Sequence, residues 1–112
     1  MCNLPIFDDI VTGRPSEVFA ALVRKLSAYT RRDRTRRFKI GITNNPHSTF
    51  SGRYASNYDE MIVLYKTRSI DSVSRLESYL VEHNWEVADN RIGGGGGRIG
   101  EPPYYLYIVR RF

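Results

Sequence analysis

The fold of this chain is decided by residues 38–46, which have the sequence FKIGITNNP and end in a polar turn. In a strand, the alternation of this stretch sends the apolar side chains to one side and Lys39, Gly41 and Thr43 to the other. A glycine in the middle of a strand weakens it unless a ligand or another backbone must come close. The row that holds Gly41 is therefore predicted to form one wall of a site.

The composition indicates one small domain with a basic surface. The chain has 112 residues, 41% of them hydrophobic, which is enough for a single core. Its net charge of +5 and its pI of about 9.6 favour a polyanionic partner such as nucleic acid, or an anionic membrane surface. We expect one domain over residues 1–112, in which residues 1–36 form an N-terminal helix and a basic connector.

Several features favour an intracellular protein, in the cytoplasm or the nucleus, that does not act in a membrane. No apolar run approaches the roughly 20 residues that a membrane-spanning helix needs, and the amino end lacks a basic-then-apolar signal pattern. The single cysteine, Cys2, cannot form a disulfide within the chain, which fits a reducing compartment.

Hydrophobic periodicity predicts the regular elements. Apolar residues at helical spacing predict one helix over residues 15–29 and another that Ser69 caps and that ends near His83. Alternating stretches predict three strands, over residues 37–43, 60–67 and 104–109. The opening before Gly13 is expected to be irregular. The expected fold is an α/β (α+β) domain with a small, mainly antiparallel three-stranded sheet flanked by helices.

Glu77 is the most informative single residue of the second predicted helix. It lies inside the arc of apolar positions, so its carboxylate should point inward. Glutamate is almost never buried without a partner, which implies a metal ion, a cation or a hydrogen-bonded cluster. A structural ion pair with Arg53 or Lys39 is the alternative, and the sequence leaves both open.

The last predicted strand suggests two further groupings if it pairs antiparallel with residues 37–43. The first is a basic end, with nucleic-acid-binding residues Arg36, Arg37, Arg110 and Arg111. In the second, Tyr105 and Tyr107 share a face with Lys39. A lysine ammonium favours the phenolate form of a nearby tyrosine and makes it a better base. Ordinary aromatic packing of the strand is the alternative.

The five consecutive glycines at 93–97 predict a loop dominated by its backbone. A strand follows them where a dinucleotide-binding motif requires a helix, and the phosphate-loop pattern also fails. We expect the loop to let two segments approach closely, with an anion-binding role as the alternative.

Five motifs follow one another along the last two thirds of the chain. They are Lys39-Ile40-Gly41-Ile42-Thr43-Asn44-Asn45-Pro46, then Arg53, the strand from Met61 to Thr67, Leu76-Glu77, and Asp89-Asn90. In this order they resemble the GIY-YIG nuclease superfamily. The resemblance implies a single GIY-YIG-like domain whose nuclease-like core spans residues 37–112.

The same resemblance implies roles for individual residues. Arg53 would steady the phosphate, Glu77 would hold Mg²⁺ or Mn²⁺, and Asn90 would support the site. Lys39 stands at the tyrosine of the "YIG" motif, as in restriction-endonuclease members of the superfamily. Tyr54 is a candidate, with Tyr58, for the histidine or tyrosine that commonly follows the family arginine.

The strand order departs from the family pattern, because the "GIY" strand normally comes just before the "YIG" strand. The best equivalent here is the last strand, so we expect a circularly permuted order with Tyr107 as the "GIY" tyrosine and Tyr105 or Tyr29 as alternatives. The implied activity is metal-dependent hydrolysis of phosphodiester bonds in DNA, or in RNA. The alternative is a nucleic-acid-binding module of the same fold without catalysis.

Overall fold

The computed structural model describes residues 4–31, 35–83 and 100–112. The elements in chain order are β1 (Ile6–Val11), α1 (Pro15–Tyr29), β2 (Arg37–Thr43), α2 (Pro46–Thr49), the π-helical turn η1 (Phe50–Tyr54), β3 (Glu60–Thr67), α3 (Ile70–His83) and β4 (Tyr104–Arg111). Both predicted helices and all three predicted strands are confirmed. The Ser69 hydroxyl accepts a hydrogen bond from the backbone N–H of Ser72, as expected of the residue that caps α3.

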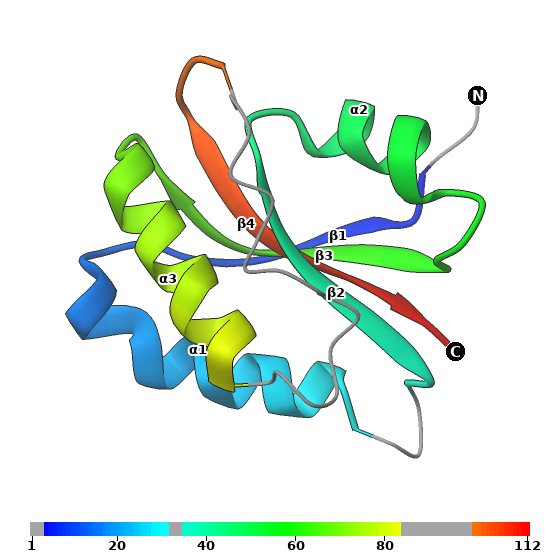
Figure 1. Ribbon diagram of the computed structural model, residues 1–112, viewed down its shortest axis with the longest axis horizontal. Helices are drawn as coiled ribbons and strands as arrows, with labels where there is room; N and C mark the ends of the chain where they lie inside the picture. The colour runs from blue at the N-terminus through cyan, green and yellow to red at the C-terminus, as the bar shows by residue number, and fades with distance from the viewer. Residues whose placement is uncertain (1–3, 32–34, 84–99) are drawn as a thin grey trace.

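The sheet has four strands in the order β1-β3-β4-β2 (Figure 1). The β1 strand is parallel to β3, whereas the β3–β4 and β4–β2 pairs are antiparallel. The mixed α/β class was predicted correctly, but the three-stranded, mainly antiparallel sheet was wrong because it omitted β1. Two adjacent aspartates interrupt the apolar pattern of this strand. One of them, Asp9, accepts hydrogen bonds from Lys25 and Tyr29 of α1. Its charged carboxylate therefore has partners and does not prevent the strand from forming.

The alternation of the strands produces two apolar layers. In one layer, Phe38 and Ile40 of β2 pack with buried residues of α1 and α3, among them Leu22 and Leu80. The other layer gathers Phe50, Tyr54, Met61, Val63, Tyr107 and Val109. Figure 1 shows the corresponding arrangement, with α1 and α3 on one side of the sheet and α2 on the other. Within the described ranges, no helix combines the length and the apolar character that crossing a bilayer requires.

An ion pair between Arg110 of β4 and Glu60 of β3 joins the sheet to α1. The side chains of Arg110 and Glu60 are only 15% and 12% exposed. The same guanidinium donates a hydrogen bond of 2.8 Å to the backbone carbonyl of Tyr29, the last residue of α1. Arg110, predicted to bind nucleic acid, is therefore engaged within the fold.

We predict that Arg110→Ala lowers the free energy of unfolding by about 3 to 5 kcal/mol, because it leaves the largely buried Glu60 carboxylate without its cation. Urea denaturation measures this loss. The control is Arg14→Ala, because the Arg14–Glu17 pair is loose, at 3.8 Å, and its side chains are 88% and 65% exposed. We expect no measurable change in the control. Equal effects of the two variants would contradict a structural role for Arg110.

Candidate functional site

Tyr107 lies directly opposite Gly41 in the antiparallel pair of β4 and β2. A Cβ atom on Gly41 would overlap the ring and the hydroxyl of Tyr107, so only glycine leaves room for this side chain. A group does approach Gly41 closely, but it is the side chain of a tyrosine and not the ligand or second backbone that the sequence predicted. Tyr29, the alternative candidate, lies on α1 and donates its hydroxyl hydrogen to Asp9 instead.

The hydroxyl of Tyr107 is bonded to the hydroxyl of Tyr54 over 2.8 Å. Both side chains are almost fully buried, at 1% and 4% exposed. Their rings meet edge to face, with centroids 5.7 Å apart. Tyr54 was a candidate from the sequence, but its bond to Tyr107 was not predicted, because 53 residues separate the two.

The π-helical turn that carries Arg53 and Tyr54 is held against the end of β2. The hydroxyls of Thr43 and Thr49 are 2.6 Å apart, which ties the last residue of β2 to the last residue of α2. Asn45 caps α2 by accepting a hydrogen bond from the backbone N–H of Ser48. Sequence reasoning missed this contact between threonines, because no spacing rule marks it.

The turn presents a buried tyrosine and an exposed arginine side by side. Tyr54 packs into the layer beneath the turn, whereas Arg53 faces solvent. Lys39 of β2 is half-buried, and its ammonium nitrogen lies 5.7 Å from the centre of the Tyr54 ring. Two cations therefore border the pair of buried tyrosines.

Glu77 is buried in α3, as its place in the apolar arc predicted, and is only 4% exposed. Its Oε2 atom is buried and accepts no hydrogen bond from the part of the chain that the structure describes. Burial raises the pKa of this carboxyl to about 7, and the nearby Lys39 ammonium opposes that rise. The predicted alternative, a structural ion pair of Glu77 with Arg53 or Lys39, does not form among the residues that the structure describes.

The charges of Glu77 and Arg53 both affect the pKa of Tyr107. Burial raises the pKa of the Tyr107 phenol above its ordinary range, and the neighbouring Tyr54 and Glu77 raise it further. The guanidinium of Arg53 acts in the opposite direction. These charge effects, the tyrosine hydrogen bond and the contact of Lys39 with Tyr54 connect five residues, which we call the β2–β4 cluster. They are Lys39, Arg53, Tyr54, Glu77 and Tyr107.

Glu77 is the single carboxylate of this cluster, so it is the one side chain of the cluster that could offer charged oxygen ligands to a divalent cation. No group of three or more histidine, cysteine, aspartate or glutamate side chains suited to a metal occurs among the described residues. Mg²⁺ typically binds through one or two carboxylates, substrate phosphates and water, and it requires oxygen ligands. A buried glutamate with an oxygen that accepts no hydrogen bond meets that requirement with a single protein ligand.

The other predicted site residues lie outside the cluster. Tyr105 pairs with Thr43, two positions along β4 from Tyr107, and the Lys66 ammonium lies 5.7 Å from the centre of its ring. Arg37 pairs with Arg111 at the opposite end of β2, and the backbone N–H of Arg36 donates to the Arg111 carbonyl. The predicted basic end therefore exists, and Arg110, which lies there too, also pairs with Glu60. Asn90 and the glycines at 93–97 lie outside the described residues.

Comparisons of the chain with protein-family models, with curated proteins and with solved structures gave no match. The resemblance to the GIY-YIG superfamily rests on the order of the motifs.

We predict that Glu77→Gln stabilises the protein at high pH and not at low pH. Folding raises the carboxyl pKa from 4.5 to about 7, so the wild type binds more protons when folded than when unfolded between these values. Its stability relative to the variant should be highest below pH 4.5, fall as the pH rises through this window, and level off above 7. The full difference is about 3 kcal/mol, from 1.36 kcal/mol per pKa unit.

The measurement is urea denaturation of both proteins across this pH range. Glu82→Gln, which changes an exposed carboxylate on the same helix, is the control and should show no such trend. A difference between wild type and Glu77→Gln that does not vary with pH would contradict the raised pKa.

Proposed function

We propose that this protein is a metal-dependent endonuclease that hydrolyses phosphodiester bonds in DNA, with a permuted GIY-YIG-like arrangement of its strands. One observation carries the proposal. The buried Glu77 carboxylate, with an oxygen that has no hydrogen-bond partner in the described chain, shares a cluster with a tyrosine hydroxyl pair and two cations. Such a combination of a buried acid and strongly shifted pKa values is typical of functional sites.

Substrate binding is assigned to the cations at the surface. Arg53 is exposed beside the buried tyrosines, so its guanidinium can reach a backbone phosphate and offset its charge. Arg36, Arg37 and Arg111 lie together at the other end of β2 and β4 and provide further backbone contacts. Binding through such contacts weakens as the salt concentration rises, because counterions are released from the DNA.

Glu77 is the residue that would hold Mg²⁺ or Mn²⁺. When bound, the ion would supply positive charge that stabilises the leaving oxygen of the phosphodiester. Without the ion, the charge of Lys39 lowers the pKa of Glu77, but burial has the larger effect and raises the pKa to about 7.

Activation of the attacking water is assigned to the two tyrosines. The Tyr107 phenol keeps its proton in the free protein because burial raises its pKa, so a relay replaces direct action of a phenolate. Water donates a proton to the Tyr107 oxygen, the Tyr107 proton moves to Tyr54 across their 2.8 Å bond, and the Tyr54 proton passes to solvent beside Lys39. The Lys39 ammonium would stabilise any negative charge that develops on these oxygens while the protons move. The hydroxide then attacks phosphorus, the bond to the leaving oxygen breaks, and that oxygen takes up a proton from solvent.

A second candidate function is a nucleic-acid-binding module of the same fold without catalysis. The raised pKa of Tyr107 favours it, because a protonated phenol is a weak base. The lack of any group of three or more metal-suited side chains among the described residues also favours it. In that case Lys39 and Arg53 contact phosphates only.

We predict that the wild type nicks supercoiled plasmid DNA in the presence of Mg²⁺ and that Glu77→Gln lowers the nicking rate by about 100-fold or more. The substitution keeps the shape of the side chain and removes the charge that would bind the ion, a loss of several kcal/mol in the transition state. Gel analysis of the supercoiled and nicked forms over time gives the rates.

Glu82→Gln and Tyr29→Phe are the controls for this experiment, because both residues lie outside the cluster. Equal nicking by wild type and Glu77→Gln, or no nicking by either with Mg²⁺ or Mn²⁺, would rule out the nuclease. Salt-dependent DNA binding together with no nicking would then identify the non-catalytic module. As a readout separate from activity, Mg²⁺ should raise the unfolding temperature of the wild type, but not of Glu77→Gln.

A further inference from the structure

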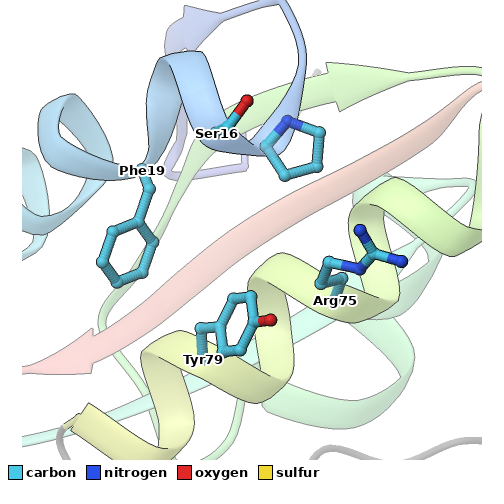
Figure 2. Close-up of a pocket in the computed structure, with 5 residues that line it drawn as sticks. Ser16, Phe19, Arg75 and Tyr79 are labelled. Atoms are coloured by element: carbon cyan, nitrogen blue, oxygen red, sulfur yellow. The ribbon is translucent and has the colours of Figure 1, made fainter.

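A groove between α1 and α3 lies apart from the β2–β4 cluster. It has a volume of about 390 Å³. Figure 2 shows Ser16 and Phe19 of α1 on one side of it and Arg75 and Tyr79 of α3 on the other. Pro15 of α1 also lines the groove. This volume falls within the range of about 300 to 1,000 Å³ that is usual for small-molecule sites.

The two aromatic rings of the groove form a corner. The centroids of Phe19 and Tyr79 are 6.0 Å apart and their planes are at 78°, so the edge of one ring meets the face of the other. Tyr79 is nonetheless 49% exposed. A flat molecule can therefore stack on an open ring face while its edge lies against the second ring, which is the arrangement that aromatic groups prefer.

Arg75 supplies a positive charge at this corner. It is exposed, and no ion pair or hydrogen bond connects it to another described residue. By contrast, Lys25 pairs with Asp9 and Arg110 pairs with Glu60. In Figure 2 the Arg75 guanidinium extends from α3 on the side that faces α1. Its planar fork of donors matches a carboxylate or a phosphate.

We propose that the groove between α1 and α3 binds a small planar aromatic molecule that carries one anionic group. The ring stacks in the corner of Phe19 and Tyr79, and the anion binds Arg75, with the Ser16 hydroxyl as a further donor. A mononucleotide combines both parts in one molecule, whether it is free or at the end of a single strand. This site does not depend on the proposed nuclease activity.

The test is an NMR titration of the isotope-labelled protein with adenosine monophosphate. The ring signals of Phe19 and Tyr79 should shift and saturate. Adenosine, which lacks the anion, and inorganic phosphate, which lacks the ring, should each bind about tenfold or more weakly, because each forgoes about 1.4 kcal/mol or more of the interaction. A tetranucleotide single strand forms the second arm. Tighter binding of the strand at the same ring signals identifies a strand end as the ligand, and equal or weaker binding identifies a free small molecule.

Variants separate this groove from general attraction to a basic protein. Arg75→Gln should weaken the binding of adenosine monophosphate about tenfold, whereas Arg24→Gln, at an exposed position of α1 outside the groove, should leave it unchanged. Glu77→Gln should also bind normally, which keeps this result independent of the nuclease test. No saturable shift of the two rings up to about 10 mM ligand, or the same affinity in Arg75→Gln and wild type, would overturn the proposal.

Discussion

The contact of Tyr107 with the backbone of Gly41 is the constraint on which the candidate site depends. The ring occupies the space that a side chain at position 41 would fill. Tyr107 in β4 therefore requires glycine at position 41 of β2. The Tyr107 hydroxyl reaches Tyr54, which fixes where the π-helical turn packs and hence where Arg53 emerges. A single glycine thus sets the spacing of residues from three separate elements.

The two buried or nearly buried glutamates illustrate how a partner changes the role of an acid. Glu60 has Arg110 beside it and joins β3 to β4 and α1, so its charge is balanced within the fold. Glu77 has an oxygen without a hydrogen-bond partner in the described chain, and its carboxyl pKa is raised by burial. A protein that retains an acid of the second kind gives up stability at neutral pH, which is usual where a group serves a ligand or a reaction.

The sequence predicted those features that depend on local pattern. Periodicity located α1, α3 and three strands, and the position of Glu77 within the apolar arc of α3 predicted its burial. The prediction failed where a distant partner decides the outcome. The Asp8-Asp9 pair concealed β1, because the pattern does not show that Asp9 is satisfied from α1. The sequence likewise did not show that Arg110 pairs with Glu60, because 50 residues separate the two.

The order of the strands has a consequence for how the protein folds. The β2 and β3 strands do not pair with each other, and each pairs with β4, which comes after both in the chain. Closing such long loops is entropically costly, so sheets built from distant segments form late and cooperatively. During synthesis, Lys39, Arg53 and Glu77 emerge well before Tyr107. The cluster that surrounds Gly41 therefore cannot assemble on a growing chain until β4 has left the ribosome.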